Sequence, residues 1–278
     1  MNRFYIDGLI KNALLEDVNN RDISSECLFA ADHTSRARFA AKQEGVLCGI
    51  EVALRVFELL DESFRAEVFL KDGAALSKGD VIAEVSGRTL ALLQGERTAL
   101  NLLQHMSGIA TLTDAYVRRT EGTKAKICDT RKTLPGLRPL QKYAVACGGG
   151  KNHRFNLSDA VMLKDNHIDA AGSIAKAVAA ARAFVGHTVT VEVETRSLAE
   201  VRQALEAGAD IIMLDNMDTD TMAEAVKLAA GRAVLEASGG ITLQNVAQVA
   251  GTGVDYISVG ALTHSVRALD ISMKFVKG

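Results

Sequence analysis

The sequence contains no tryptophan and only two prolines, and aromatic residues make up 5% of its 278 positions. With so few aromatic side chains, a stacking platform for nucleic-acid bases is not expected. The formal net charge is −2, so the chain also lacks the excess of cations with which proteins hold polyanions. No apolar run approaches the ~20 residues that would span a bilayer, and residues 1–25 lack the apolar core of a signal peptide. We therefore expect a globular cytoplasmic protein with no nucleic-acid or membrane partner.

The cysteines form no C-x-x-C pair and show no spacing typical of metal ligands. The four of them are Cys27, Cys48, Cys128 and Cys147. We expect reduced thiols, as in most cytoplasmic proteins. Cys147 stands beside a run of three glycines and could be a nucleophile, but no neighbouring pattern supports that role. A buried structural thiol is the favoured interpretation.

Length and a hydrophobic content of 48% allow one large core or two smaller ones, and the pattern changes near residue 110. Before that point, residues 71–93 alternate in short runs, which predicts a small antiparallel sheet of hairpins. Residues 51–60 and 96–104 have helical patterns. A structural domain is favoured here over a lipoyl-like carrier module, because nothing marks a lysine as an attachment site. The turns of the hairpins are placed at Asp72-Gly73, Gly79-Asp80 and Gly87.

From about residue 125 onward, short apolar runs alternate with longer segments of helical periodicity. Continuous apolar strands that alternate with helices are typical of a parallel sheet covered by helices, and the even spacing favours a β/α barrel. The apolar runs cover residues 125–128, 160–163, 189–193, 211–214, 233–235 and 254–259. The helical segments include residues 173–185, 198–207 and 219–230.

Charged or small polar residues stand at or just after the ends of these six runs. In a barrel such positions meet at one rim, where the active site of this architecture lies. Any single one of them could simply be a strand end that meets solvent, but the whole set favours one pocket. The residues are Asp129, Arg131, Lys164, Glu194, Asp215, Glu236, Ser258 and Gly260.

Residues 129–167, here called the basic segment, hold seven lysines and arginines against three aspartates, a formal charge of +4. Both prolines and the run Gly148-Gly149-Gly150 also fall within it. Rigid turns, bare backbone and cations in one segment predict a pocket for a multiply anionic small molecule.

Two further strand-end signals concern phosphate and metal. Ser238-Gly239-Gly240 follows the fifth run and Ser258-Val259-Gly260 closes the sixth, and barrel enzymes often bind phosphate in the loops after their final two strands. Glu194 and Asp215 end neighbouring strands, so their carboxylates could share Mg²⁺. Alternatively, each carboxylate pairs with a lysine or arginine of the basic segment.

Several long motifs run in order along nearly the whole chain. They are GERTALN (95–101), DTRKTLPGLR (129–138), KYAV (142–145), GGGKNHR (148–154), LKDNH (163–167), VEVE (191–194), MLDN (213–216), EASGGI (236–241) and SVGALTHS (258–265). Together these motifs resemble the quinolinate phosphoribosyltransferase family. The main departure from the family pattern is the turn at residues 21–24.

The resemblance implies transfer of phosphoribose from phosphoribosyl pyrophosphate (PRPP) to quinolinate, which gives nicotinate mononucleotide, pyrophosphate and CO₂ in NAD biosynthesis. It implies an N-terminal α/β sandwich, residues 1–110 joined by the tail 267–278. An incomplete, seven-stranded α/β barrel follows over residues 111–266; six strands are counted from the pattern and the seventh comes from the family. Mg²⁺ is the implied cofactor, and homodimers or larger assemblies carry the site at the subunit interface.

Roles for individual residues also follow from the resemblance. Arginines bind carboxylates in a bidentate geometry that lysine cannot give. Quinolinate would be held by Thr130, Arg131, Lys132, His153, Arg154 and Lys164, together with Arg97 of the partner subunit. The PRPP phosphate would be held by Ser238, Gly239, Gly240, Ser258 and Gly260. The catalytic set would be Lys132, Lys164, Glu194 and Asp215, with Mg²⁺ at the last two.

Competing interpretations remain at this stage. Lys164 could form a Schiff base in an aldolase-type barrel, although such an enzyme needs no arginine cluster. His153 could act as a general base, but the attacking pyridine nitrogen has no proton to lose. A molybdenum-operon-type sister protein of the same fold, or a silent paralogue that binds a pyridine carboxylate or PRPP, is an alternative for the whole chain. The intact Glu194, Asp215 and glycine loops disfavour the silent paralogue.

Overall fold

The computed structural model describes residues 1–276, and the chain divides into two compact units. The first unit contains residues 1–114, residues 134–149 and the chain from residue 265 onward. The second contains residues 115–133 and 150–264. Among the described residues, no helix combines the length and the apolar character needed to cross a bilayer.

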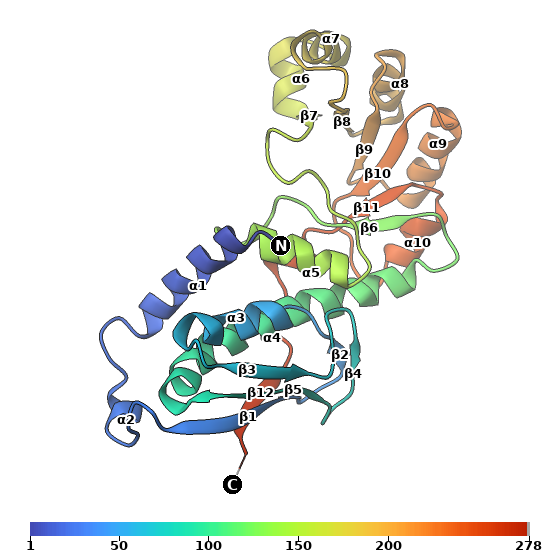
Figure 1. Ribbon diagram of the computed structural model, residues 1–278. Coiled ribbons are helices and arrows are strands. Elements are labelled where there is room, and N and C mark those ends of the chain that lie inside the picture. The colour runs from blue at the N-terminus through green and yellow to red at the C-terminus, as the bar shows by residue number, and fades with distance from the viewer. Residues whose placement is uncertain (277–278) are drawn as a thin grey trace. The chain divides into compact units, whose positions relative to one another are not determined.

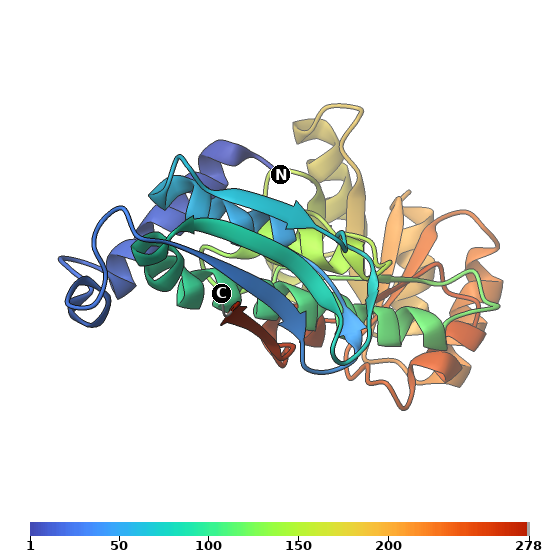
Figure 2. The ribbon, with the colours of Figure 1, turned by 60° about the horizontal axis from the view of Figure 1, so that its bottom comes forward.

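The first unit contains a four-stranded antiparallel sheet in the order β12-β1-β5-β3 (Figure 2). A separate two-stranded pair joins β2 and β4. The strands are β1 (Thr34–Ala41), β2 (Gly45–Val46), β3 (Arg65–Val68), β4 (Ala75–Leu76), β5 (Val81–Arg88) and β12 (Ile271–Phe275). The helices are α1 (Arg3–Asp17), α2 (Ile23–Glu26), α3 (Ile50–Leu60), α4 (Thr89–Arg119) and α5 (Arg138–Cys147), of which α4 runs on into residues of the second unit.

The predicted antiparallel sheet exists, but the hairpin arrangement predicted within residues 71–93 is wrong. Strand β5 pairs with β1 and β3, whereas β4 pairs with β2. Gly73 and Gly79 have φ of +88° and +100°, as turns require. Gly87 instead lies inside β5, where a Cβ would come within 2.8 Å of the Asp61 carboxylate. Glycine is needed here because the Asp61 carboxylate lies close to the backbone. The sequence pattern cannot distinguish such a glycine from one in a turn.

The core of the first unit is built where α3 packs on the sheet. The rings of Phe39 in β1 and Phe57 in α3 lie 6.1 Å apart, and Phe57 stacks on Phe64 at 5.3 Å. Helix α4 approaches Phe57 through Gly95, where an added Cβ would lie 2.9 Å from the ring. Helix α4 spans Thr89–Arg119, so the predicted helix over residues 96–104 is too short. The glycines at 95 and 108 lower the helical propensity of the sequence, but they do not end the helix.

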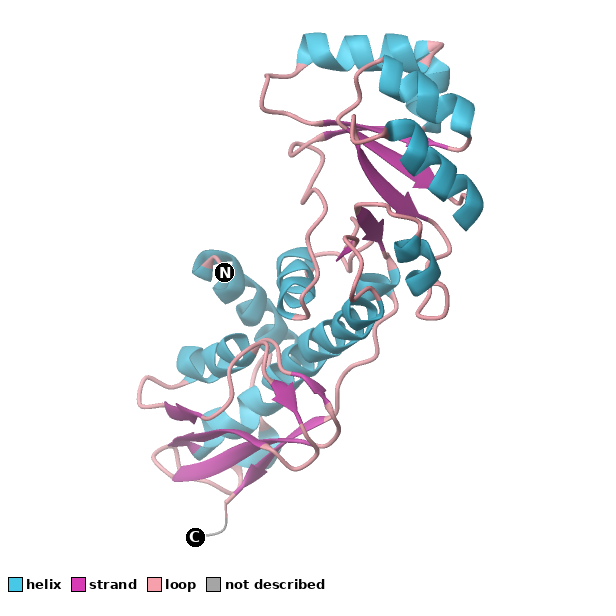
Figure 3. Ribbon diagram, turned by 90° about the vertical axis from the view of Figure 1, so that its right-hand side faces the viewer, coloured by secondary structure: helices cyan, strands magenta, loops and turns pink. Residues whose placement is uncertain are grey.

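The second unit is a parallel sheet of six strands in the order β6-β11-β10-β9-β8-β7, with its helices along the outer side of the strands (Figures 1 and 3). The strands are β6 (Lys126–Cys128), β7 (Val161–Leu163), β8 (Val191–Thr195), β9 (Ile211–Asp215), β10 (Val234–Ser238) and β11 (Tyr256–Ser258). The helices are α6 (Asp165–Ala171), α7 (Ile174–Phe184), α8 (Leu198–Glu206), α9 (Thr219–Ala229), α10 (Val246–Gly251) and α11 (Ala261–His264).

Local sequence explains where the outer helices begin. Ser173, Ser197 and Asp218 stand at the N-caps of α7, α8 and α9, and each side chain accepts a hydrogen bond from a backbone N–H of the first turn. Gly208, just past α8, has φ of +77°, as a helix end favours. All six predicted strands and the three predicted helices are confirmed.

Two expectations about the sheet need revision. Strand β10 continues to Ser238, so Glu236 lies inside the strand and is buried, not beyond its end. A charged residue ends an apolar run in the sequence but need not end the strand. The seventh strand is not confirmed, since the parallel sheet has six strands within residues 1–276. A single parallel bridge joins Lys151 to Cys128 of β6.

Candidate active site

A cavity of about 340 Å³ lies at the carboxyl ends of the parallel strands and is here called the strand-end pocket. All of its lining residues belong to the second unit. They are Thr130, Arg131, Lys132, His153, Arg154, Met162, Lys164, Glu194, Met213, Asp215, Glu236, Ser238 and Ser258.

Strand periodicity arranges this lining in two layers. Because side chains two residues apart lie on the same face of a strand, each outer residue has a deeper neighbour. The outer layer is Lys164, Glu194, Asp215 and Ser238, at the ends of β7, β8, β9 and β10. The deeper layer is Met162, Glu192, Met213 and Glu236, in the same strands. The pocket thus has a polar rim above a floor of Met162, Met213 and the buried Glu236, whereas Glu192 is buried and does not line the cavity.

Both carboxylates of the outer layer have a hydrogen-bond donor beside them. Lys164 Nζ lies 2.7 Å from Glu194 Oε2. Asp215 Oδ2 accepts a hydrogen bond from the side-chain amide of Asn216 at 2.9 Å. Asn216 itself has φ of +54°, a conformation in which asparagine is among the better tolerated residues. The residue following β9 therefore turns back to orient the carboxylate of its neighbour.

The cations come from the basic segment. Arg154 is half-buried and donates from Nη1 to the carbonyl of Ala160 at 3.0 Å. Burial, and secondarily the nearby charge of Arg131, lower the pKa of Arg154. Arg131 and Lys132 are exposed. Two guanidinium groups close enough to repel each other make a site that an anion would stabilise.

His153 is held between two buried carboxylates. Its Nδ1 accepts the backbone N–H of Arg154 at 2.7 Å, so the neutral ring carries its proton on Nε2. That Nε2 lies 3.2 Å from Glu192 Oε2 and 3.4 Å from Glu236 Oε2. Burial, and then the charge of Glu192, raise the pKa of Glu236 to about 7. Within residues 1–276, the Oε1 atoms of both glutamates are buried without a hydrogen-bond partner. For Glu236, the raised pKa and this buried oxygen together favour a protonated carboxyl group near neutral pH.

Glycines shape the loops after β10 and β11. Gly239 and Gly240 have φ of +90° and +61°, and a Cβ on Gly239 would overlap the Asn216 amide. A Cβ on Gly260 would lie 3.0 Å from Lys132 Cδ, so this glycine admits the lysine side chain. Without a Cβ at these three positions the loop backbone can approach an anion closely, which suits phosphate.

The donor set fits a hard cation. Glu194 and Asp215 end adjacent strands, where Glu194 is paired with Met213 and Thr195 with Leu214. Each carboxylate has two oxygens, so the hydrogen bonds from Lys164 and Asn216 still leave capacity for a metal. Two carboxylates with substrate oxygens and waters are a typical environment for Mg²⁺.

Most residues singled out from the sequence meet in this pocket. Gly239, Gly240 and Gly260 lie in the adjoining loops, whereas Arg97 is an exposed residue of α4 in the first unit. Asp129 is buried behind the pocket and accepts the backbone N–H of His153 at 2.9 Å. Those that line it are Thr130, Arg131, Lys132, His153, Arg154, Lys164, Glu194, Asp215, Glu236, Ser238 and Ser258. The sequence reasoning missed Met162, Glu192, Met213 and Asn216. Strand alternation was the available signal for the first three, since each stands two residues before a residue already singled out.

Fold and site together define a parallel α/β protein with an anion-binding pocket at the carboxyl ends of its strands. The family model described as "Quinolinate phosphoribosyl transferase, C-terminal domain" matches residues 109–274. The corresponding N-terminal domain model matches residues 22–107.

Relatives with known names agree with these models. A Bacillus subtilis protein named "Probable nicotinate-nucleotide pyrophosphorylase [carboxylating]" is 49% identical over 98% of this chain and 94% of its own. A Mycobacterium leprae nicotinate-nucleotide pyrophosphorylase [carboxylating] is 45% identical over 95% of each chain. The crystal structure of NadC from Streptococcus pyogenes has a TM-score of 0.96 and 47% identity, covering 100% of this chain and 99% of that one. The chain belongs to the quinolinate phosphoribosyltransferase family.

Proposed function

We propose that this protein transfers the phosphoribosyl group of PRPP to the ring nitrogen of quinolinate, with release of pyrophosphate and CO₂. The observation that carries the proposal is the strand-end pocket, in which four cations and the carboxylates of Glu194 and Asp215 line one cavity. The names of relatives at 45–49% identity over nearly the whole chain support it. The product, nicotinate mononucleotide, would enter NAD biosynthesis.

Binding of the dicarboxylate falls to the basic segment. Arg131 and Arg154 can each bind a carboxylate through two parallel N–H donors. The other residues that would surround the substrate are Thr130, Lys132, His153 and Lys164. The binding of an anion would offset the repulsion between the two guanidinium groups. Quinolinate would then be fixed with its nitrogen directed to the ribose, so that much of the rate acceleration comes from positioning.

Departure of pyrophosphate leaves positive character on the ribose carbon and negative charge on the leaving group. Lys132 and Lys164 offer fixed positive charge for that negative charge without reorganising at the moment of reaction. Glu194 and Asp215 would hold Mg²⁺, which when bound supplies further charge neutralisation at the phosphate oxygens. Ser238, Gly239, Gly240, Ser258 and Gly260 would hold the 5′-phosphate through hydroxyl and backbone N–H groups.

Decarboxylation follows from the product of that transfer. Once ribosylated, the pyridine nitrogen is cationic and stabilises the carbanion left when the adjacent carboxylate departs as CO₂. A proton then takes the place of the carboxylate on that ring carbon. No covalent nucleophile is required, so the cysteines have no assigned part in the reaction.

The finer architecture is also proposed here. The bridge between Lys151 and Cys128 lies on the edge of β6 that no full strand occupies, and it supports the view that the segment at Lys151 serves as the seventh position of an incomplete barrel. Residues 1–110 with the tail 267–278, of which the last two lie outside the described residues, would form the N-terminal domain, and residues 111–266 the barrel. Residues 134–149 are an exception, because they group with the first unit. A homodimer or larger assembly would bring Arg97 of the partner subunit to the pocket.

The direct test is an assay of purified protein with quinolinate, PRPP and Mg²⁺ that follows nicotinate mononucleotide and CO₂. Nicotinate replaces quinolinate in a parallel reaction, because it lacks the carboxylate that would be lost. We expect product with quinolinate and none with nicotinate. Chelation of the metal should abolish the formation of product. No turnover with either acid, in a sample whose folding is verified by circular dichroism, would contradict the proposal and return the sister-protein or silent-paralogue alternatives.

A further inference from the structure

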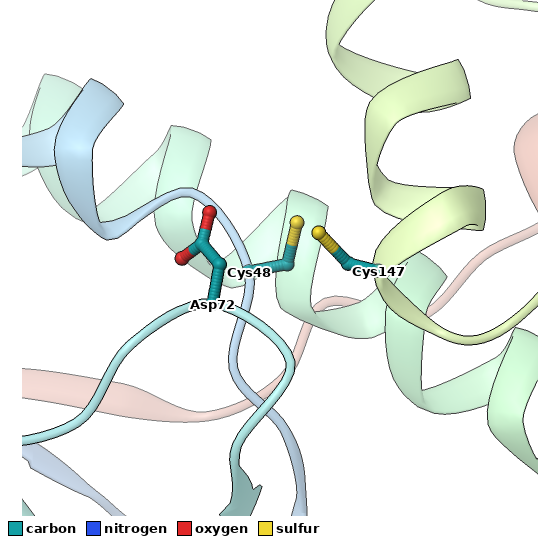
Figure 4. Close-up of side chains that lie close together, drawn as sticks. All are labelled: Cys48, Asp72 and Cys147. Atoms are coloured by element: carbon teal, nitrogen blue, oxygen red, sulfur yellow. The ribbon is translucent and has the colours of Figure 1, made fainter.

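Two cysteines of the first unit face each other although about 100 residues separate them. Cys48 stands two residues before α3, and Cys147 is the last residue of α5. Their sulfurs and a carboxylate oxygen of Asp72 all lie within 4.8 Å of one another. Figure 4 shows the two sulfurs next to each other, with Asp72 on the Cys48 side.

Asp72 holds the two thiol-bearing segments together. Its Oδ1 accepts the backbone N–H groups of Gly49 and Ile50 at 2.9 and 3.0 Å, which caps the start of α3. Its Oδ2 accepts the hydroxyl of Tyr143, in α5, at 2.9 Å. The carboxylate therefore has structural bonds on both oxygens, which leaves a pair of thiols as the reactive part of the cluster and disfavours a three-ligand metal site.

The two thiols differ in reactivity. A hydrogen bond from Cys48 lowers the pKa of Cys147, whereas the same bond and burial raise the pKa of Cys48. Cys48 is fully buried, whereas Cys147 is half-buried. A more accessible thiol with greater thiolate character reacts first with an oxidant, and a neighbouring thiol can then resolve the product.

We propose that Cys48 and Cys147 form a reversible disulfide, in which Cys147 reacts first with a peroxide and Cys48 resolves the sulfenic acid. In the first step the Cys147 thiolate attacks hydrogen peroxide, the O–O bond breaks, and hydroxide leaves. In the second step the Cys48 sulfur loses its proton and displaces hydroxide from Cys147, forming the S–S bond. Two thiols and one peroxide thus give one disulfide and two waters.

The cross-link would restrain the chain near the proposed active site. Cys147 directly precedes Gly148-Gly149-Gly150, after which the chain continues to Lys151 and then to His153 and Arg154 of the strand-end pocket. Oxidation would fasten the start of this glycine run to the segment before α3. A reductant would release it.

The test is to treat the folded, full-length protein with hydrogen peroxide and measure its intact mass and its non-reduced peptide map. We expect the loss of two hydrogen atoms per chain, a cross-linked peptide pair containing Cys48 and Cys147, and reversal by a thiol reductant. Cys27→Ser is the matched control, because Cys27 is exposed and outside the cluster, and it should behave as the wild type. Cys48→Ser should instead accumulate a sulfenic acid on Cys147 that dimedone traps.

A second measurement guards against variants that fold poorly. A cross-link that closes a loop of about 100 residues should raise the Tm of the oxidised wild type by about 5 °C over the reduced form. Cys147→Ser should show no difference between the two conditions. Oxidation confined to Cys27, or a stoichiometric metal ion that protects both thiols, would overturn the proposal.

Discussion

Arg131 and Arg154 place two like charges in one pocket, and this repulsion is the clearest residue-level sign of what the pocket accepts. The pKa of Arg154 is lowered by burial and by Arg131, so an anion that binds between them gains from both groups. A carboxylate matches a guanidinium in shape as well as in charge. The expected ligand therefore carries carboxylates, and its binding should depend mainly on these two side chains.

Replacement of Arg131 tests that geometry. Arg131→Ala should lower kcat/KM for quinolinate about a hundredfold, which corresponds to the ~3 kcal/mol that charge-assisted hydrogen bonds contribute. Arg131→Lys restores the charge but not the paired donors, so it should recover only part of the activity. Steady-state kinetics with each substrate varied in turn would measure this. Full recovery by lysine would show that charge alone matters.

Glu236 predicts a pH dependence of stability. Its pKa is raised from 4.5 to about 7 in the folded protein, so the folded state holds this proton more tightly than the unfolded state. The stability contributed by the group is therefore present below about pH 4.5 and is lost as the pH rises through 7. Glu236→Gln cannot ionise and does not lose this stability. From pH 5 to pH 8, its free energy of unfolding should therefore rise relative to that of the wild type by up to about 3 kcal/mol. Urea denaturation at several pH values would measure the difference, and parallel pH curves would contradict it.

At the scale of elements, the loop after β10 contains a matched pair of glycines. Both Gly239 and Gly240 have positive φ, but only a Cβ on Gly239 meets the Asn216 amide, whereas one on Gly240 meets nothing within 4 Å. Gly239→Ala should disturb Asn216 and, through it, Asp215. We therefore expect Gly239→Ala to raise the KM for PRPP about tenfold more than Gly240→Ala does, since ~1.4 kcal/mol corresponds to that factor. Equal effects of the two substitutions would indicate that only backbone strain is involved.

Helical glycines make a second matched pair. Gly8 in α1 is exposed with open space around it, so Gly8→Ala should stabilise the protein by about 0.5–1 kcal/mol. Gly108 in α4 packs against the backbone of residues 267–268, and an added Cβ would overlap the carbonyl oxygen of Arg267. Gly108→Ala should therefore destabilise by about 2 kcal/mol or more. Thermal unfolding of both variants would decide, and a stabilised Gly108→Ala would contradict the packing.

The sequence predicted elements well where apolar runs were continuous and poorly where a buried polar group or a glycine interrupted them. The six parallel strands and helices α7 to α9 were found from periodicity and capping residues. The length of β10 could not be predicted, because Glu236 looks like the end of an apolar run. Its burial inside the strand depends on Glu192 and His153, which come from other segments. Gly108 concealed the length of α4 for a similar reason, since its value lies in a contact with residues far along the chain. The sequence motifs predicted most residues of the pocket. The residues of its buried floor can be found only from the register of the strands.

At the scale of the whole molecule, the proposed assembly makes a prediction that a monomer cannot satisfy. If Arg97 acts in the partner's pocket, Arg97→Ala and Arg131→Ala damage the same site from different chains. Mixed dimers of the two inactive variants would then contain one intact site and one doubly damaged site. After subunit exchange, an equal mixture should regain about a quarter of the wild-type activity, since half of the dimers are mixed. Failure to regain activity, when native mass spectrometry shows mixed dimers, would contradict the trans role of Arg97.

The pairing of β12 with β1 has a consequence for how the chain acquires its structure during synthesis. Residues 34–41 leave the ribosome early, yet the strand that covers their outer edge comes from residues 271–275. Every element of the second unit is translated in between. An unpaired edge is open to wrong partners for as long as it waits, so a chaperone that shields β1 would help most during that interval. The unit that is begun first is thus completed last.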